Sequence, residues 1–172
     1  MGFKWWNVAV LAAVGTLWFA GVTQREKPVL PEAHAARVRT LEAAASARRD
    51  DPGSVRALAQ AYLDARQPGM ALNVVETAPA ELRADPTVEH VYARALLEQG
   101  RSADALAAEK RVLELCASPE RTCSSFLVAS ATRRADILHE LVQLGVEDAA
   151  ANPEQSRLAY QNATRHVTLV VR

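Results

Sequence analysis

Residues that bend or interrupt regular structure are scarce in this chain, and so are aromatic side chains. Its 172 residues include 7 Gly, 8 Pro, 3 Trp, 3 Tyr and 3 Phe. An excess of one charge is also missing, because 20 Lys and Arg balance 20 Asp and Glu. A protein that binds nucleic acid through bulk electrostatics normally has a basic domain or stripe, so this balance argues against that class.

Alanine is abundant instead, at 34 of the 172 residues. Alanine has the highest intrinsic helix propensity, and turn-forming residues are few, so the composition predicts an all-α protein. The aromatic residues are unevenly placed, because five of the nine lie in the first nineteen positions. The chain therefore contains two parts of different composition.

The first part is a run without charge over residues 5–22, from Trp5 to Val22. Eighteen residues in a helix span about 27 Å, which is enough for the hydrocarbon core of a bilayer. Tryptophans lie near both ends of the run, as rings at the two membrane interfaces do. We therefore predict a transmembrane anchor over residues 1–23, followed by a polar linker over residues 24–31.

The competing interpretation of this run is a secretory signal peptide, which needs small residues at positions −3 and −1 of its cleavage site. Cleavage after Ala20 would place Trp18 at −3, so an uncleaved anchor (or uncleaved signal) is favoured. Positive charges flank both ends about equally and do not choose an orientation. A short N-terminus before a long C-terminal domain favours export of that domain. We predict a single-pass protein of the bacterial inner (cytoplasmic) membrane with a periplasmic C-terminal domain.

The second part, residues 32–172, shows helical periodicity and an internal repeat. Asp51-Pro52 recurs as Asp85-Pro86, an offset of 34 residues. At this offset small residues align with small ones, as Ala59 does with Ala93, and large apolar residues align with large apolar ones. This pattern is typical of helix pairs that bury their apolar faces by stacking on one another. A helix over about residues 32–49 precedes the first pair as a half-unit.

The two units resemble the tetratricopeptide repeat (TPR) family. The family's large, small and turn positions are filled in the first unit by Val55, Leu58, Ala59, Tyr62 and Ala71, and in the second by Glu89, Tyr92, Ala93, Leu96, Gly100 and Ala105. Arg66 departs from the pattern at the usual turn glycine, and Glu89 and Glu109 stand where large residues are usual. The resemblance implies a short α-solenoid of antiparallel helix pairs, with repeats at about residues 52–85 and 86–119.

The C-terminal third departs further from the pattern and is predicted to cap the solenoid. Residues 124–144 are expected to form one long helix, which Gly145 ends. Its apolar residues are Phe126, Leu127, Ile137, Leu138, Leu141 and Leu144. Asn152 and Pro153 then begin another helix, as N-cap and first helical residue. Terminal units of stacked repeats are commonly atypical because they must close the core, so we place capping helices at residues 124–167.

The only two cysteines, Cys116 and Cys123, flank a loop between two predicted helices. Their spacing matches neither a CxxC redox pair nor a four-ligand zinc site. A disulfide here would contribute roughly 2 to 3 kcal/mol by the chain-entropy estimate and would persist only in an oxidising compartment. The alternative is a pair of buried thiols. We favour the disulfide, which agrees with an exported domain.

The sequence contains no complete motif for catalysis or metal binding. His139-Glu140 begins like the HExxH motif of zinc proteases, but Gln143 occupies the position of the second histidine. The other histidines are scattered, and no Gly-rich phosphate loop or GxSxG motif occurs. We therefore predict a protein that is not an enzyme and has no cofactor, metal site or small-molecule substrate.

The resemblance also implies a binding surface, because the first helix of each TPR-like pair lines a concave groove that holds a partner segment. Eight residues of this chain map to that groove: Arg56, Gln60, Leu63, Asp64, His90, Arg94, Leu97 and Glu98. Their charges are mixed. The expected ligand is therefore a protein segment held by polar and apolar contacts.

Two functions are compatible with these features. The leading hypothesis is a membrane-anchored, non-catalytic adaptor or scaffold in a bacterial envelope assembly, with envelope or membrane-complex proteins as partners. The alternative is a structural subunit of a larger membrane complex, held by its transmembrane helix. A stripe of small residues on one face of the anchor permits close helix packing in lipid, although alanine-rich composition also accounts for it. The stripe consists of Ala9, Ala13, Thr16 and Ala20.

Overall fold

A computed structural model of the chain describes residues 32–48 and 50–165, which form eight α-helices and no strand. The helices are α2 (Glu32–Ala47), α3 (Pro52–Asp64), α4 (Pro68–Glu76), α5 (Ala80–Arg83), α6 (Pro86–Glu98), α7 (Ser102–Ala117), α8 (Ser125–Gln143) and α9 (Pro153–Arg165). The all-α prediction is confirmed for this part of the chain. The predicted anchor (1–23), the linker (24–31) and residues 166–167 of the predicted cap lie outside it. None of the described helices is both long and apolar enough to cross a membrane.

Aspartate and proline begin the first helix of both repeats. The Asp51 carboxylate accepts a hydrogen bond from the Gly53 N–H at 2.9 Å, and the Asp85 carboxylate accepts one from the Thr87 N–H at 2.8 Å. The proline after each aspartate stands in the first turn, where an N–H would have no helical partner. A hydrogen bond from the Ser54 hydroxyl, together with that from Gly53, holds the pKa of Asp51 below its usual value. Both helices therefore begin at the same point of the repeat.

The helix boundaries follow the 34-residue offset of the sequence. α3 and α6 both contain 13 residues and begin at Pro52 and Pro86. The helices that follow them, α4 and α7, begin at Pro68 and Ser102, which is the same offset. They differ in length, 9 residues against 16, because Pro79 lies just beyond α4 and cannot donate a helical hydrogen bond. The short α5 follows this proline.

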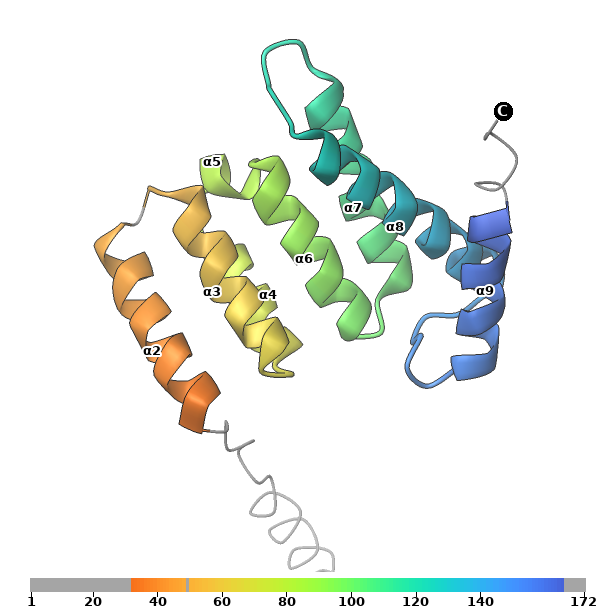
Figure 1. The fold of residues 1–172 in the computed structure, drawn as a ribbon, viewed down its shortest axis with the longest axis horizontal. Coiled ribbons are helices and arrows are strands. Elements are labelled where there is room, and N and C mark those ends of the chain that lie inside the picture. Colours follow the sequence, from red (N-terminus) through yellow and green to blue (C-terminus); the bar gives the residue numbers. More distant parts are fainter. Residues whose placement is uncertain (1–31, 49, 166–172) are drawn as a thin grey trace, which may run out of the picture. The chain divides into compact units, whose positions relative to one another are not determined.

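Successive long helices of this part pack side by side, and α3 also lies against α6 (Figure 1). Alanines that recur at the 34-residue offset are completely buried: Ala59 and Ala93 in α3 and α6, and Ala71 and Ala105 in α4 and α7 are all 0 % exposed. A methyl group lets two helix backbones approach closely, and larger neighbours fill the remaining space. Packing of these helices therefore depends on small residues at repeated positions.

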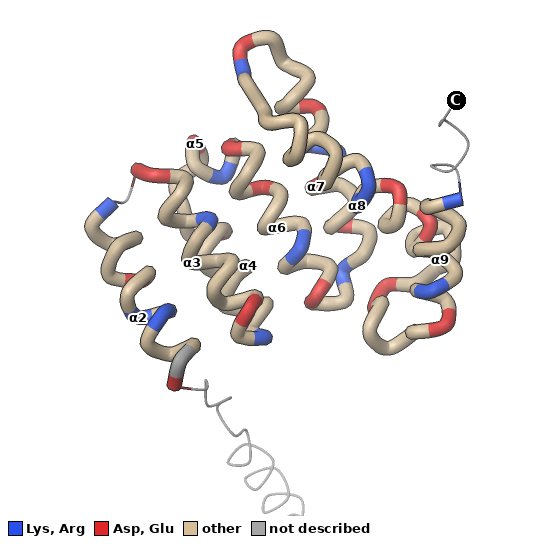
Figure 2. The backbone as a smooth tube through the Cα atoms, viewed as in Figure 1, with Lys and Arg blue, Asp and Glu red and all other residues tan. Residues whose placement is uncertain are grey.

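Charged residues of both signs are interspersed along the described helices (Figure 2). Several of them pair locally, as Arg101 does with Asp104 at 2.7 Å. Exposed pairs of this kind contribute little to stability, about 0 to 1 kcal/mol each. Figure 2 shows no helix that carries a long stripe of one sign, which agrees with the balanced composition.

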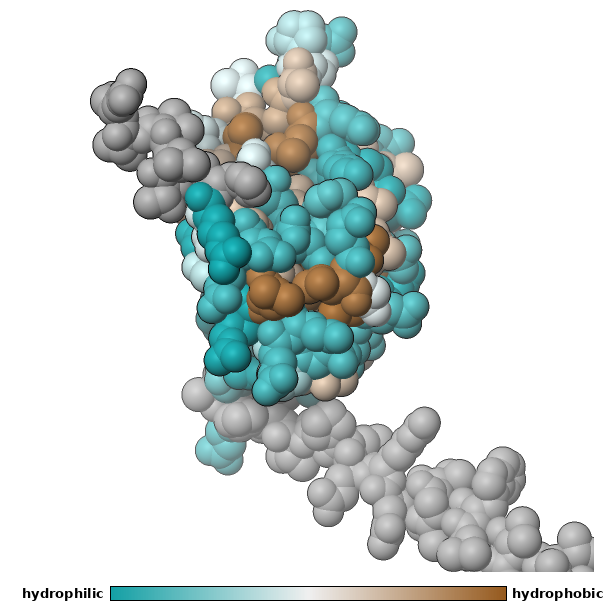
Figure 3. Space-filling view, turned by 90° about the vertical axis from the view of Figure 1, so that its right-hand side faces the viewer, coloured by the Kyte–Doolittle hydropathy of each residue, from teal (hydrophilic) through white to brown (hydrophobic). Residues whose placement is uncertain are grey.

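The two C-terminal helices leave apolar side chains exposed. Phe126, which was expected among the apolar residues of the long helix, is 82 % exposed, whereas Leu127 beside it is 8 % exposed. Consecutive residues point about 100° apart on a helix, so only one of the two faces the neighbouring helix. Leu158 and Tyr160 of α9 are 42 % and 46 % exposed. Figure 3 views the side where α9 lies and shows hydrophobic patches within a hydrophilic surface.

Three helices are followed, two positions after their last residue, by a residue with a left-handed backbone conformation: Arg66 (φ 58°), Gly100 (φ 74°) and Gly145 (φ 69°). A residue with a Cβ atom is strained by about 1 to 2 kcal/mol in this conformation. We therefore expect Arg66→Gly to raise the free energy of unfolding by about 1 kcal/mol, measured by denaturant titration. The matched control is Gly145→Ala, which should lower it by a similar amount because its Cβ would meet no atom within 4 Å and would add only backbone strain. A destabilising Arg66→Gly would show that its side chain makes an important contact.

Tyr62 of α3 donates a hydrogen bond from its hydroxyl to the Glu42 carboxylate of α2 at 2.5 Å. Burial, followed by this hydrogen bond, raises the pKa of Tyr62 from 10.0 to about 12. The folded state therefore holds the hydroxyl proton of Tyr62 more tightly than the unfolded state does. The contribution of this proton to the free energy of unfolding is complete below pH 10 and is lost as the pH rises to about 12. We expect the free energy of unfolding to fall less steeply between pH 10 and about 12 in Tyr62→Phe than in the original protein, as measured by urea titration across this range. An equally steep fall in the variant would assign the effect to other groups.

Candidate functional site

Residues from α2, α3, α6 and the start of α8 surround an open pocket of about 420 Å³. The lining residues are Arg37, Arg56, Ala57, Gln60, Thr87, His90, Val91, Ser124, Phe126 and Leu127. We call this pocket the α3/α6 groove, because these two helices contribute most of its lining. It is the part of the described structure that brings the first helices of both repeats together around an open space.

The groove combines cationic and apolar walls. Arg56 is exposed, and the Arg37 side chain is 58 % exposed. Phe126 adds an aromatic ring on the α8 side, and no Asp or Glu is present among the described residues that line the groove. Arginine and aromatic residues are the side chains most enriched at the centres of protein interfaces. The lining is therefore suited to contact with another protein.

Three of the eight residues predicted for the groove line it: Arg56, Gln60 and His90. The prediction for Leu63 is wrong, because this side chain is 1 % exposed and belongs to the core. Leu63 lies on the same stripe of α3 as Arg56, but α3 is packed by α2, α4 and α6. Leu63 therefore faces these helices, whereas Arg56 and Asp64 are exposed.

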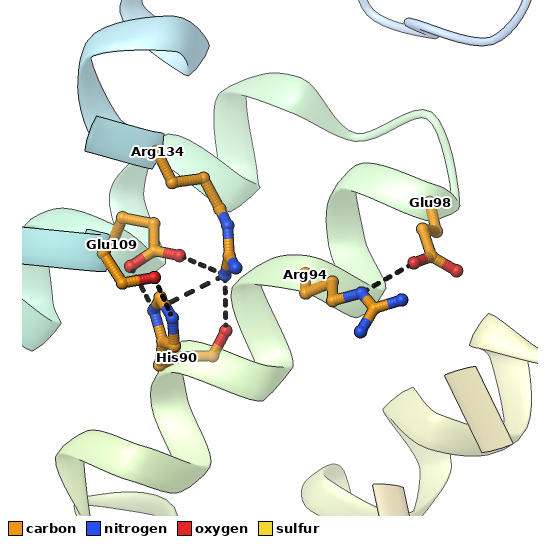
Figure 4. A network of polar contacts seen from close by, with 6 residues as sticks. His90, Arg94, Glu98, Glu109 and Arg134 are labelled. Atoms are coloured by element: carbon orange, nitrogen blue, oxygen red, sulfur yellow. Dashed lines mark hydrogen bonds and ion pairs between the residues drawn. The ribbon is translucent and has the colours of Figure 1, made fainter. Parts of the chain in front are cut away.

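The other four predicted residues are not among those that line the groove. Asp64 contacts it only through hydrogen bonds to two lining residues. Leu97 packs, partly buried, against the core. Arg94 and Glu98 pair with each other at 2.9 Å, and Figure 4 shows this pair apart from the contacts of His90.

Sequence reasoning missed the residues that α2 and α8 contribute, above all Arg37 and Phe126. Arg37 lies in the half-unit before the aligned repeats, and the 34-residue spacing is lost before α8 begins. Ser124 could have indicated the contribution of α8, because it caps this helix by accepting a hydrogen bond from the Leu127 N–H at 3.2 Å. A capped helix directly after the second pair is placed to act as the first helix of a third, and its first turn then faces the groove.

Behind His90, a polar network joins α6, α7 and α8 (Figure 4). Glu109 is 0 % exposed, and its two oxygens lie 2.8 Å from His90 Nδ1 and 2.7 Å from Arg134 Nη1. Arg134 also donates to the His90 carbonyl oxygen at 3.1 Å, and Ser130 Oγ lies 3.1 Å from His90 Nε2. Among the described residues, no buried side-chain nitrogen or oxygen lacks a partner. Glu109 therefore stands, with all its polar atoms paired, at a position where the repeat pattern expects a large apolar side chain.

The line Ser130–His90–Glu109 has the order of a serine-hydrolase triad, with the Glu109 carboxylate 2.8 Å from His90 Nδ1 and the Ser130 hydroxyl 3.1 Å from His90 Nε2. One feature opposes that chemistry. Ser130 is inside α8, where backbone N–H groups bond within the helix and cannot stabilise an oxyanion. We interpret the line as a structural contact.

A second pocket, of about 600 Å³, lies among α4 to α7. Some of its polar groups are paired within the protein: Arg111 Nε donates to the Glu89 carboxylate at 2.7 Å, and the Tyr92 hydroxyl donates to Glu76 at 3.1 Å. Burial, and then the hydrogen bond to Glu76, raises the pKa of Tyr92. Arg121 donates to a backbone carbonyl at 2.8 Å. This pocket is larger than the groove, but α3 contributes nothing to its lining, so it does not bring the first helices of both repeats together.

The two cysteines, Cys116 and Cys123, are bonded to each other, with Cα atoms 5.4 Å apart. The bond closes the loop between α7 and α8 and packs against a small cluster separate from the main core. This cluster consists of Val112, Leu127 and Ala131. Since Phe126 follows Cys123 by three positions, the bond and the cluster together hold the turn that presents the aromatic ring to the groove.

Within residues 32–48 and 50–165, no three His, Cys, Asp or Glu side chains lie close enough together to hold a metal ion. His139, from the incomplete HExxH pattern, is exposed, and Glu140 accepts a hydrogen bond from Asn162 Nδ2 at 3.1 Å.

No protein-family model, curated protein or solved structure matches this chain.

Proposed function

We propose that this protein is a membrane-anchored, non-catalytic adaptor of a bacterial envelope assembly, and that it binds a segment of a partner protein in the α3/α6 groove. Residues 5–22 anchor it, and the helices from α2 onward form a short TPR-like solenoid on the periplasmic side. The observation that carries the proposal is the groove itself, where Arg56, His90 and the exposed ring of Phe126 surround one open pocket.

The exposure of Phe126 supports a binding function. A phenylalanine that is 82 % exposed leaves a large apolar area in water, and burying it against a partner would be favourable. Side chains that dominate binding energy are commonly aromatic residues and arginines near the centre of an interface. Phe126 and Arg56 are such a pair, and they belong to helices that are 60 residues or more apart in the sequence.

The solenoid and the location have support of their own. Helix starts and buried alanines both recur at the offset of 34 residues, as expected for stacked pairs of one type. The bond between Cys116 and Cys123 is of a kind that persists in the periplasm and is rare in a reducing cytosol.

The groove can be tested with a photo-reactive amino acid introduced at Gln60 in intact cells. We expect partner proteins to crosslink from this position, and Arg56→Glu or Phe126→Ser to reduce the crosslinks about tenfold or more, because each removes a central contact. Crosslinks are measured by immunoblotting and mass spectrometry of the products.

Two matched controls accompany this experiment. Arg94→Glu changes a similar charge on α6 outside the lining and should leave the crosslinks unchanged. The same photo-reactive residue at Arg157, exposed on α9, should give none of the same products. Crosslinks that survive Arg56→Glu and Phe126→Ser, or that arise equally from Arg157, would refute binding in the groove.

A further inference from the structure

The arginines of the groove have little acidic compensation. Arg37 lies 3.4 Å from Asp64 Oδ2, at a site where the arginine side chain is 58 % exposed, so this contact is long and well solvated. Asp64 also accepts a shorter hydrogen bond from Gln60 Nε2, at 2.8 Å. No partner of the Arg56 guanidinium is found among the described residues within hydrogen-bond or ion-pair distance. Both guanidinium groups can therefore turn toward a ligand without breaking a strong pair.

The acidic residues near Arg37 and Arg56 do not cancel the positive charge of these two side chains. Glu109 is the acidic group nearest to His90, but it is completely buried, and Arg134 neutralises it at 2.7 Å. The other acidic groups close by, Asp51 and Asp85, accept hydrogen bonds at the starts of α3 and α6, where the positive end of the helix dipole faces them. Asp64 offsets part of the charge at Arg37, and the exposed Arg56 leaves the open side of the groove with a net positive charge.

The largest apolar side chains of the lining come from α8 and from Val91 of α6. Phe126 is exposed, whereas Leu127 and Val91 are 8 % and 7 % exposed and form a firm surface beside it. An apolar side chain placed on this surface would bury the ring of Phe126 and its own area together. A ligand that fits both halves needs a negative group and a bulky apolar group within a short distance of each other.

We infer that the α3/α6 groove selects an internal protein segment in which an Asp or Glu side chain stands within two positions of a bulky apolar residue. Arg56 and Arg37 pair with the carboxylate, which arginine binds through two parallel hydrogen bonds. Phe126 contacts the apolar side chain. This inference rests on the proposed function and adds the chemistry of the partner to it.

The full-length chain, purified in detergent, would be tested against random nine-residue segments displayed on phage, with their C-termini fused so that no free carboxylate is present. We expect the enriched segments to contain Asp or Glu next to Leu, Ile, Met or Phe. A synthetic peptide of the most enriched sequence, amidated at its C-terminus, is then compared with its acidic-to-amide form by fluorescence anisotropy.

The amide form should bind about tenfold more weakly, because a hydrogen bond to a charged group is lost. Arg56→Glu should weaken the binding of the acidic peptide by a similar factor and remove the difference in affinity between the two peptides. Phe126→Ser should weaken the binding of both peptides and keep the ratio of their affinities. Arg94→Glu should change neither affinity. Binding of the acidic peptide should fall at high ionic strength, since exposed charges are screened.

The outcomes separate the inference from the function on which it rests. Segments that bind in the groove without an acidic residue, or equal binding of the acidic and amide peptides, would overturn the inference and leave the adaptor function standing. The inference would also be overturned if the full difference in affinity between the two peptides were retained in Arg56→Glu. If no segment binds, or if binding is insensitive to Phe126→Ser, the proposed function itself fails.

Discussion

Replacing Arg134 with leucine is expected to lower the free energy of unfolding by about 3 to 5 kcal/mol, because it removes the arginine partner of a buried carboxylate and leaves only His90 beside it. Glu109 is 0 % exposed, so water cannot replace the guanidinium that now lies 2.7 Å from its carboxylate. The carbonyl oxygen of His90 would lose a donor in the same substitution. Thermal unfolding followed by circular dichroism should show a midpoint lowered by roughly 10 °C or more.

The neighbouring Arg133 provides the control. It lies over the ring of Tyr160, with its guanidinium carbon 5.7 Å from the ring centroid, and is exposed. Arg133→Leu should cost about 1 kcal/mol or less, as expected for a solvated contact. A similar loss in Arg133→Leu and Arg134→Leu would show that burial of Glu109 is not what makes Arg134 important.

The double variant Glu109→Leu with Arg134→Leu should recover most or all of the stability. Replacing both members of a buried ion pair by apolar residues of similar volume is often neutral or stabilising. Glu109 also stands at a position where the repeat pattern expects a large side chain, so a leucine there suits its surroundings. A double variant as unstable as the sum of the two single variants would mean that the network contributes more than the apolar packing it replaces.

Removing the disulfide should have the second large effect. Cys116→Ala with Cys123→Ala is expected to cost about 2 to 3 kcal/mol, because the bond closes a short loop and restricts the unfolded chain. The cluster that it supports contains only three buried residues, Val112, Leu127 and Ala131, so the loss should be concentrated at the joined ends of α7 and α8. Amide hydrogen exchange should therefore accelerate first in the opening turns of α8, which include Phe126.

Thiol labelling in intact cells measures the bond and the compartment together. We expect Cys116 and Cys123 to react with a membrane-impermeant reagent only after treatment with reductant. Labelling without reductant, by a permeant reagent alone, would place this domain in the cytosol and contradict the proposed location. Unchanged hydrogen exchange in the double alanine variant would contradict the local role of the bond.

How well the sequence predicted the fold depends on the range of the interactions involved. The starts of α3, α6, α8 and α9 were visible because the residues at those starts act on their own backbone, as Asp51 and Asp85 do. The repeated alanines were visible for a related reason, since close helix packing restricts side-chain size at fixed spacing. Leu63 was misplaced because its exposure depends on three neighbouring helices rather than on its position in α3.

The sequence was enough to predict where the repeats and the C-terminal helices begin and which small residues recur, because these features depend on the chain within about one turn or one repeat. The tertiary structure alone decided that Arg37 and Phe126, from α2 and α8, share a groove with Arg56. It also revealed that Glu109, a departure from the repeat pattern, is matched by Arg134 from α8. These contacts join residues of different helices, 19 positions or more apart in the chain, and no local pattern in the sequence encodes such a contact.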